Sequence, residues 1–554
     1  MIVVGKDPAL YNKEKETERI ILNQYANEKW LGREPQFDIE SITETENTDI
    51  IVVGGGLAGV AAARQAAELG EKVILFEKCR CIQARSGDFA VMDSKAAKRW
   101  GREKLDKAAI TNDLMQDMAY KASQNILRRW AEEAGEAFDW YMDGMEGVEV
   151  LDRTDQVPSK GVKCYIQPRR LPLPVGFDNG KERFKCYQVT AWVRPSHIPM
   201  CVANFERAME TGNLISYFNT RVEKLLRQPG SRVEGVIART AEGTLKKTYA
   251  NKGVILATGD YMNDKEMLKR FLPGMTETPK QWTSYLMNRE PSNTGDGHKM
   301  ALWAGAKLQD SPHAPMAHHM GSVFGVSDFL LLDTRGKRFV NEDAPGQQIG
   351  SQIENLADKT AWQIVDGNWR EDIPREYPSH GNVCFVTEDE TLENGSIYDK
   401  LCFIDNYIAP KYIEQNIEEG KLIRAETLDE LIDKIGLPKE EALASIQRYN
   451  RMCHQKKDTD YGKEKERLFA VEKAPFYAAK FTPAVMIAAL GGIQSDEDAH
   501  CYDTEGKMIP GLYAAGNVQG NRVAVDYPLT VPGLSHSMAL VYGRIAARNL
   551  AEGI

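Results

Sequence analysis

The pattern of apolar and polar positions is clearest between residues 47 and 78. Four apolar, β-branched residues at 50–53 are typical of a strand that is buried on both faces. An alanine-rich stretch at 60–69 has helical character and ends at Gly70, and a second apolar run follows at 73–76. The order predicts a strand, a helix and a second strand.

The turn between the first strand and the helix carries three glycines at G-x-G-x-x-G spacing, Gly54, Gly56 and Gly59. The first allows a sharp turn, the second leaves room for a pyrophosphate, and the third allows close packing of helix and strand. The helix N-terminus adds free N–H groups and a positive dipole end. Glu77, at the end of the second strand, is placed to accept hydrogen bonds from a ribose. The unit therefore predicts a dinucleotide site.

Further along the chain the pattern predicts more strands and helices. Strands are expected at 222–225, 232–239, 245–249, 253–256, 329–331, 338–340 and within 509–517. Helices are expected within 113–144, 293–305, 425–435, 439–450 and 535–550. Pro, Gly, Arg and aromatic residues dominate 151–200, where we expect irregular structure that either lines a site or forms a surface excursion.

The chain of 554 residues is longer than one hydrophobic core usually covers, so we expect at least two domains. Changes in pattern divide it into a polar N-terminal extension at 1–46, a first nucleotide-binding part at 47–310, an inserted domain at 311–477 and a second nucleotide-binding part at 478–554. The extension has a helix-like patch near residues 16–30. The predicted fold class is α/β.

Composition narrows the class of partner. Hydrophobic residues make up 42% and charged residues 27% of the chain, as in ordinary globular proteins, and a net charge of −10 argues against nucleic acid as a partner. The nine cysteines show no regular framework, so we expect reduced thiols and a cytoplasmic location. No apolar run reaches membrane-spanning length, and we expect no membrane partner.

Four further motifs accompany the glycine turn. They are Leu-Ala-Thr-Gly at 256–259, Thr-Gly-Asp-Gly at 294–297, Gly-Lys-Arg-Phe-Val-Asn-Glu at 336–342 and Pro-Gly-Leu-Tyr-Ala-Ala-Gly-Asn at 510–517. In this order the set resembles the fumarate reductase / 3-ketosteroid dehydrogenase flavoprotein family, from about residue 47 to the end. The resemblance implies a discontinuous, Rossmann-like FAD-binding domain of the glutathione reductase type with an inserted α+β capping domain. It also implies hydride transfer between flavin and a C–C bond next to a carbonyl.

We expect the FAD to be bound noncovalently, because no flavin-linking histidine motif is present. The resemblance and the glycine turn together place its contacts at Gly54, Gly56, Leu57, Ala58, Gly59, Glu77, Lys78, Ser86, Gly87, Val222, Ala257, Thr258, Gly259, Asp296, Gly516, Asn517, Leu534 and Ser535.

The substrate end separates two branches of the family. Fumarate reductases hold carboxylates with arginines and a histidine, whereas here Gly346 stands where the proton-donating arginine is expected, 482–492 lacks the histidine, and 526–533 contains no arginine. Ketosteroid dehydrogenases polarise a ketone with a tyrosine and a glycine N–H. Tyr527 and Gly533 match that pattern, Gly533 about two residues late, and are the catalytic candidates. We therefore predict a 3-oxosteroid or bile-acid-like ketone as the small-molecule substrate.

Two alternative functions stay open on the sequence. One is reduction of an unsaturated carboxylic acid, as in fumarate or urocanate reductases, and the other is an FAD-binding electron-transfer subunit. Because no second dinucleotide fold, haem or iron–sulfur motif is present, an external electron donor or acceptor is needed, and its identity is unknown.

For several polar residues the sequence leaves two positions or roles open. His536 faces the flavin ring or packs, Arg522 is exposed or near the substrate, and Arg169 and Arg170 meet an acidic substrate tail or solvent. We expect no metal site, because adjacent histidines rarely converge on one ion. The histidines concerned are His313, His318 and His319.

Overall fold

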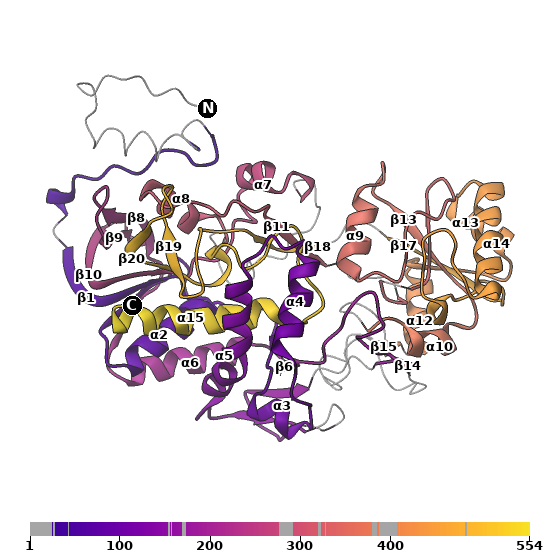
Figure 1. Ribbon diagram of the computed structural model, residues 1–554, viewed down its shortest axis with the longest axis horizontal. Helices are drawn as coiled ribbons and strands as arrows, with labels where there is room; N and C mark the ends of the chain where they lie inside the picture. Colours follow the sequence, from indigo (N-terminus) through magenta and orange to yellow (C-terminus); the bar gives the residue numbers. More distant parts are fainter. Residues whose placement is uncertain are drawn as a thin grey trace.

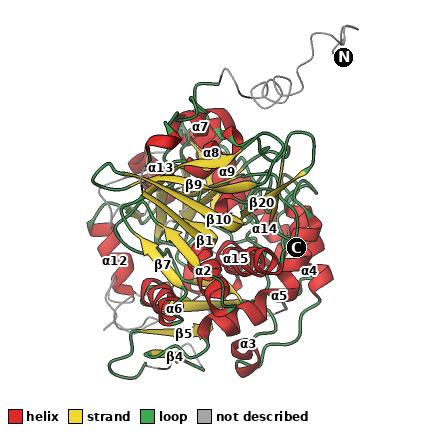
Figure 2. Cartoon of the chain, turned by 90° about the vertical axis from the view of Figure 1, so that its left-hand side faces the viewer, coloured by secondary structure: helices red, strands yellow, loops and turns green. Residues whose placement is uncertain are grey.

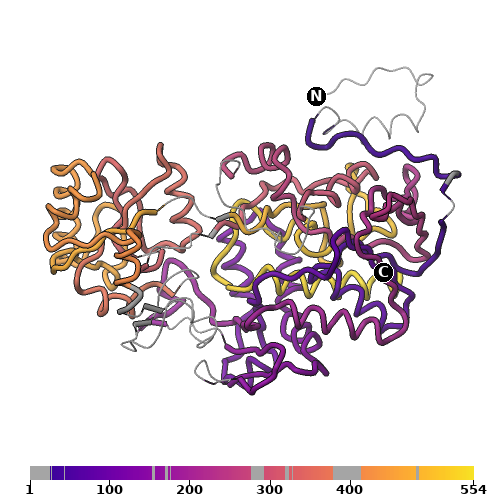
Figure 3. Tube along the Cα trace, turned by 180° about the vertical axis from the view of Figure 1, so that it is seen from behind, coloured from indigo at the N-terminus to yellow at the C-terminus, as the bar shows by residue number. Residues whose placement is uncertain are grey.

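The chain forms two bodies joined by a narrow connection, which Figures 1 and 3 show from opposite sides. The computed structural model describes residues 25, 28–42, 44–152, 156, 158–168, 173–174, 176–275, 292–318, 323–326, 328–378, 385–386, 407–408, 410–481 and 485–554. The larger body contains the strands of the glycine-turn unit and the C-terminal helix, and the smaller body contains the helices and strands labelled from α9 to β17.

The larger body is built on a sheet with the strand order β19-β20-β10-β1-β2-β7, to which β9 and β8 are added beside β10. The pairs β1–β2, β1–β10, β2–β7 and β10–β20 are parallel. The strands are β1 (Glu44–Val53), β2 (Val73–Phe76), β7 (Leu214–Tyr217), β8 (Arg221–Arg227), β9 (Val233–Arg239), β10 (Leu245–Leu256), β19 (His500–Tyr502) and β20 (Met508–Ala514).

The apolar run at the end of β1 is buried on both faces, as predicted. Ile50 and Val52 belong to a core formed with the helices on one face, whereas Ile51 and Val53 belong to a second core that includes Val222. A parallel strand covered on both faces reads as a continuous hydrophobic run for this reason. Figure 2 shows α2, α6 and α15 stacked beside the central strands. The covering helices are α2 (Leu57–Glu68), α5 (Gln124–Met142), α6 (Ile198–Glu210) and α15 (Leu534–Glu552).

The prediction of irregular structure over 151–200 is wrong for two short strands and the start of α6, whereas most other described residues there are irregular. A second sheet has the order β3-β6-β5-β4, with β5 and β6 contributed by this segment. Their side chains are buried, and the partners lie far apart in sequence, so the local Pro and Arg content gave no indication of pairing. The strands are β3 (Asp88–Ala90), β4 (Val148–Val150), β5 (Cys164–Pro168) and β6 (Thr190–Arg194).

Two other local predictions need correction. The helical stretch at 113–144 is two helices, α4 (Lys107–Asp117) and α5, because Ser123 begins α5 as an N-cap. The strand expected at 338–340 is an isolated bridge between Leu332 and Arg338. The remaining helices of the larger body are α3 (Lys95–Arg99), α7 (Lys265–Phe271), α8 (Asp296–Trp303) and the short turns η2 (Ile39–Ser41), η3 (Pro273–Met275) and η7 (Gly516–Val518).

The smaller body has its own sheet, of order β12-β13-β17-β16, with antiparallel pairs. An antiparallel pair of β11 (Ala314–His318) and β18 (Val485–Leu490) lies where the chain passes between the bodies. The elements of the smaller body are β12 (Leu330–Asp333), α9 (Gly346–Glu354), β13 (Ala361–Val365), α10 (Trp369–Asp372), η5 (Ile373–Arg375), β14 (Phe385–Val386), β15 (Tyr407–Ile408), α12 (Pro410–Glu418), β16 (Leu422–Ala425), α13 (Leu428–Ile435), α14 (Lys439–Gln455), η6 (Lys465–Arg467) and β17 (Phe476–Phe481).

The N-terminal residues that the structure describes lie along the larger body. Trp30 is buried and packs edge-on against Phe271, with ring centroids 5.2 Å apart. Ile42 packs with Leu226 and Ile237 on the outer side of the β8–β9–β10 strands. Most of the helix-like patch predicted at 16–30 falls outside the described residues. None of the helices described here has the length and apolar character that crossing a bilayer requires.

A segment that we call the strap, residues 177–187, connects the two bodies by hydrogen bonds and an ion pair. On the smaller body, the Tyr377 hydroxyl donates to the Lys185 carbonyl at 2.7 Å, and Arg467 forms an ion pair with Glu182 at 2.6 Å. On the larger body, the Tyr187 N–H donates to the Thr530 carbonyl at 2.9 Å. The strap therefore touches the smaller body with one half and the loop of Thr530 with the other.

Replacing Arg467 by Gln is expected to lower the free energy of unfolding by about 3–5 kcal/mol, because it leaves the buried carboxylate of Asp343 and the partly buried one of Glu182 without their cation. Urea denaturation followed by circular dichroism measures the effect. Arg424→Gln is the matched control, since its exposed pair with Glu426 contributes at most about 1 kcal/mol. Equal, small shifts for both variants would contradict the prediction.

Candidate functional site

The glycine turn after β1 is closed too tightly for side chains. A Cβ atom at Gly59 would lie 1.8 Å from the Gly54 carbonyl oxygen, and one at Gly54 would lie 2.4 Å from the Ala257 carbonyl oxygen. Gly54 also has a φ of +110°, which L-residues rarely adopt. A Cβ at Gly56 would meet open space instead. The first and third glycines therefore serve packing, whereas the second leaves the start of α2 uncovered.

Glu77 lies directly beside this turn at the end of β2. One carboxylate oxygen accepts the Gly55 N–H at 2.5 Å and the other accepts the Cys79 N–H at 2.7 Å. Both bonds hold the buried carboxylate in one orientation. Since each carboxylate oxygen has more than one acceptor site, Glu77 can accept further hydrogen bonds from ribose hydroxyls.

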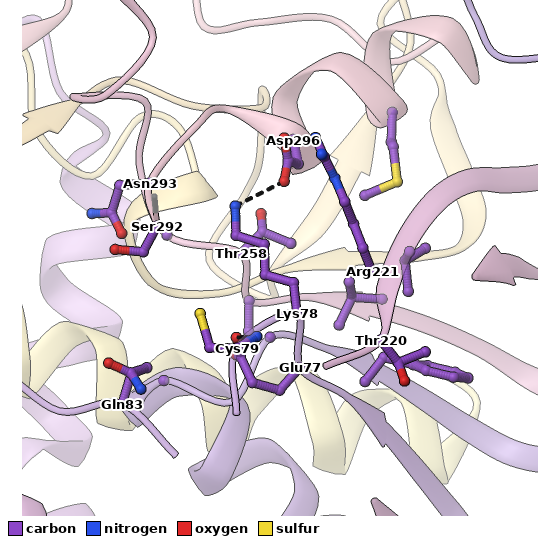
Figure 4. A pocket seen from close by; sticks show the side chains of 18 residues that line it. Glu77, Lys78, Cys79, Gln83, Thr220, Arg221, Thr258, Ser292, Asn293 and Asp296 are labelled. Carbon is purple, nitrogen blue, oxygen red and sulfur yellow. Dashed lines mark hydrogen bonds and ion pairs between the residues drawn. The ribbon is translucent and has the colours of Figure 1, made fainter. Parts of the chain in front are cut away.

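A cavity of about 120 Å³ opens at the carboxyl ends of these strands, and Figure 4 shows the side chains that surround it. Ligands bind at this edge of parallel α/β sheets. The lining residues are Val53, Gly54, Gly56, Phe76, Glu77, Lys78, Cys79, Gln83, Thr220, Arg221, Val222, Ala257, Thr258, Gly259, Ser292, Asn293, Asp296 and Met300.

Half of these lining residues are among the predicted cofactor contacts. The structure brings together Gly54, Gly56, Glu77, Lys78, Val222, Ala257, Thr258, Gly259 and Asp296, which come from five separate parts of the chain. The prediction missed the polar residues Gln83, Thr220, Arg221, Ser292 and Asn293. Thr220 and Arg221 precede the predicted strand at 222, and Ser292 and Asn293 precede the helix at 296, so both pairs occupied recognisable turns.

Two cations meet one carboxylate at the edge of the cavity. Asp296 accepts from Lys78 Nζ at 3.0 Å and from Arg221 Nη2 at 2.7 Å, as Figure 4 shows for the side chains. Burial alone would raise the pKa of Asp296, but Lys78 and Arg221 outweigh it and lower that pKa. Asp296 thus stays ionised and fixes both basic side chains beside Glu77.

The polar groups inside the cavity fit the ribose and diphosphate of a dinucleotide. The hydroxyls of Thr258 and Ser292 are buried and have no hydrogen-bond partner among the described residues. Buried hydroxyls without partners are unfavourable unless a ligand or water completes them. Together with the uncovered backbone at Gly56 and the carboxylate of Glu77, they form a donor and acceptor set that suits FAD.

A second group of predicted contacts lies along a hydrogen-bonded path leading away from this cavity. Asn293 and Asn517 both donate to the buried Asp260 carboxylate, at 2.8 Å and 3.2 Å. Gly516 lies close to α2, because its Cβ would be 3.0 Å from the Ala58 Cβ. The path therefore connects the glycine turn to the Gly516–Asn517 turn that follows β20.

The catalytic candidates Tyr527 and Gly533 meet at the start of α15. Gly533 is the N-cap with a φ of +86°, and a Cβ there would lie 2.7 Å from the backbone of Phe89. The Tyr527 hydroxyl accepts the Ser535 N–H at 3.1 Å. Burial raises the pKa of Tyr527 to about 12, so the phenol is neutral at physiological pH. The predicted contacts Ser86 and Gly87 immediately precede β3, the strand that contains Phe89.

The structure also places Arg522 and several of the candidate histidines. Arg522 is buried beside Asn517, to which its Nη2 donates at 3.0 Å, so the exposed reading of Arg522 is wrong. His313 is buried and bonded to the Tyr261 hydroxyl at 2.6 Å. His536 packs against Phe89, with ring centroids 5.7 Å apart. Arg169, Arg170, His319 and the side chain of His318 lie outside the described residues.

Comparison with known proteins gives a consistent result. Residues 49–530 match the FAD binding domain family. The chain is 24% identical to an NADH:acrylate oxidoreductase of Vibrio harveyi, covering 92% of this chain and 51% of that protein, so it spans about half of that relative's length. It is 26% identical to a vinyl phenol reductase of Lactiplantibacillus plantarum, covering 92% of this chain and 98% of that protein.

Solved structures with a similar fold give the second comparison. The crystal structure of 3-ketosteroid-delta4-(5alpha)-dehydrogenase from Rhodococcus jostii RHA1, in complex with 4-androstene-3,17-dione, superposes with a TM-score of 0.68 at 20% identity, covering 94% of this chain and all of that one. Fumarate reductases and 3-oxosteroid 1-dehydrogenases are further relatives, at 25% and 27% identity.

Proposed function

The chain belongs to the FAD binding domain family and is an FAD-dependent oxidoreductase, and from this premise we propose that it acts on the C–C bond adjacent to a ketone. The FAD cofactor and the action on CH–CH groups predicted from the sequence are confirmed by the family match and the relatives. The proposed substrate is a 3-oxosteroid or a bile-acid-like ketone. FAD supplies hydride chemistry when it is bound.

The observation that carries the proposal is the buried, neutral phenol of Tyr527 at the N-terminus of α15. A phenol is a hydrogen-bond donor as well as an acceptor, and the Tyr527 hydroxyl accepts the Ser535 N–H. When a C–C bond beside a ketone reacts, negative charge develops on the ketone oxygen, and preorganised donors at that oxygen stabilise the transition state. In our proposal the hydroxyl of Tyr527 and the N–H of Gly533 form such a donor set, since the N–H groups of Leu534 and Ser535 already donate to the Val531 carbonyl and the Tyr527 hydroxyl.

The surroundings of Tyr527 support an apolar substrate. Leu529, Val531 and Leu534 are buried in the same hydrophobic cluster as Tyr527. Apolar side chains of this kind suit a hydrophobic ring substrate. A carboxylate next to them would lose its water without gaining a cation, which costs free energy.

We further propose that the smaller body serves as a cap over the ring end of the cofactor. Its sheet is separate from the nucleotide sheet, and the chain enters and leaves it beside β11 and β18. The proposed division keeps the predicted limits, with an extension at 1–46, the FAD-binding parts at 47–310 and 478–554, and the cap at 311–477. The strap, which contacts both bodies, would limit how far such a cap opens.

The direct test is to reduce the purified yellow protein anaerobically and to follow its reoxidation by a panel of compounds. We expect fast reoxidation by 3-oxosteroid enones and slow reoxidation by fumarate, urocanate and acrylate. Fast reoxidation by the acids alone would overturn the proposed substrate class. Turnover without any partner protein would exclude the role of an electron-transfer subunit, and an external electron donor or acceptor of unknown identity is still required for a full cycle.

One observation favours the carboxylic acid alternative. Arg522 is a buried guanidinium; burial lowers its pKa to about 10, and the nearby Tyr527 offsets part of that lowering. A carboxylate group would find a cation there, which the sequence had not placed at the site. The reoxidation panel decides between this alternative and the ketone.

Replacing Glu77 by Gln is expected to weaken FAD binding about tenfold to a hundredfold. The amide keeps the size of the side chain but loses the charge that accepts the Gly55 and Cys79 N–H groups and the ribose hydroxyls. Titration of the apoprotein with FAD, followed by flavin fluorescence, measures the dissociation constant. Glu71→Gln, at an ion pair with Lys252 away from the cavity, is the control and should bind FAD as the wild type does.

A further inference from the structure

Several deeply buried arginines pair with carboxylates, and Arg522 differs from these in its partners. Arg338 pairs with Glu342 and Asp458, and Arg467 pairs with Asp343. No ion pair within the described part of the chain includes Arg522. Its Nη2 donates to Asn517 Oδ1 at 3.0 Å, its Nε donates to the Gln519 carbonyl at 3.4 Å, and its Nη1 is buried without a hydrogen-bond partner among the described residues.

The loop that holds Arg522 contains a second residue of this kind. Gln519 is 2% exposed, and neither its Oε1 nor its Nε2 has a partner among the described residues. The side chain of Asn517 connects Arg522 to Asp260. Its oxygen accepts a hydrogen bond from Arg522, and its nitrogen donates one to the Asp260 carboxylate. The loop thus presents buried donors that the protein itself leaves unused.

A buried cation without a carboxylate is strongly unfavourable unless another electron-rich group lies against it. The position of Arg522 indicates which group that is. Its partner Asn517 belongs to the turn that packs on α2 through Gly516, on the cofactor side of the larger body. The N-terminus of α15, a helix of 19 residues, lies close by and adds the positive end of its dipole.

We propose that Nη1 of Arg522 binds the pyrimidine edge of the flavin, at N1 and the C2 carbonyl oxygen, and offsets the negative charge that this edge gains when the flavin is reduced. The inference rests on the proposed FAD-dependent function. Positive charge at this edge favours the reduced cofactor. Arg522 is thus a residue that sets the redox potential, and Asn517 is the positioning residue that orients it.

The test compares the holoenzymes of wild type, Arg522→Lys and Arg522→Gln. The flavin potential is measured by equilibration with a reference dye under anaerobic conditions. For Arg522→Gln we expect the equilibrium constant for two-electron reduction to fall about tenfold to a hundredfold, which corresponds to about 30 to 60 mV. Arg522→Lys keeps the charge but not the fork of donors, so its loss should be smaller.

A second probe does not depend on the substrate. Sulfite binds to oxidised flavin and places negative charge on the same pyrimidine edge, so its affinity should fall at least tenfold in Arg522→Gln. Arg544→Gln is the matched control, because Arg544 is a buried arginine on α15 that is bonded to Gln65 at 2.9 Å and paired with Glu136 at 3.3 Å. It should lower thermal stability while leaving both the potential and the sulfite affinity unchanged.

An unchanged potential and an unchanged sulfite affinity in Arg522→Gln would overturn the proposal, and a raised KM in that variant would assign the guanidinium to the substrate. A different result is expected if the proposed function is wrong but the role of Arg522 is right. In that case the wild-type protein would be reoxidised by none of the ketones, whereas the potential of Arg522→Gln would still be lowered.

Discussion

Replacing Gly59 by Val should give a folded but colourless protein. The smallest side chain at this position would already place its Cβ 1.8 Å from the Gly54 carbonyl oxygen, so α2 must move away from β1. That movement shifts the N–H groups that face the diphosphate, and we expect the dissociation constant for FAD to rise about a thousandfold or more. The ratio of absorbance at 450 nm to that at 280 nm, after purification and after incubation with excess FAD, measures the loss.

The control for Gly59 is Gly274→Ala. Gly274 lies in η3, its φ is outside the left-handed region, and a Cβ there would meet nothing within 4 Å. This variant should be as yellow as the wild type. If the Gly59 variant retained stoichiometric FAD, the diphosphate would not lie at this turn, and the assignment of the cavity would be wrong.

Replacing Tyr527 by Phe is expected to slow ketone turnover about a hundredfold to a thousandfold while leaving FAD bound, which is the usual effect of removing one donor from a developing oxyanion. The change removes only the hydroxyl that meets the Ser535 N–H. Stopped-flow reoxidation of the reduced enzyme by an enone separates this rate from the binding of the substrate. Because the pKa of Tyr527 is about 12, ionisation of this phenol should not lower the wild-type rate below about pH 11.

Tyr542→Phe provides the comparison for Tyr527. Tyr542 is also buried, and its hydroxyl donates to the Ile126 carbonyl at 2.9 Å from the same helix that begins at Leu534. Loss of this hydroxyl should cost stability without slowing the reaction. Equal rates for Tyr527→Phe and the wild type would remove the phenol from the ketone site and leave it as a cap for α15.

The parts of the molecule that could be predicted from the sequence are those fixed by local chemistry. The glycine spacing, the apolar run at 50–53 and the acid at Glu77 each have a short-range cause, and the structure contains all three features together. The pairing of β5 with β6 could not be predicted in this way, because it depends on contacts between segments whose own sequences favour turns.

The candidate site shows the same limit. Val222 was expected because it lies in a strand, whereas Thr220 and Ser292 reach the cavity only because two distant turns meet there. The sequence left Arg522 either exposed or near the substrate, since burial without a carboxylate is a property of the whole fold. Sequence patterns therefore predicted the backbone around the cavity better than the polar side chains that complete its lining.

The last 50 residues have a consequence for how the protein is made. Strand β20 pairs with β10 in the middle of the nucleotide sheet, and α15 packs against α2, the helix that begins at the glycine turn. During synthesis, the ribosome must release these two elements before they can join the earlier ones. We therefore expect the nascent chain to bind its cofactor stably only after β20 and α15 have emerged, and a premature stop codon before β20 to give a product that binds it poorly.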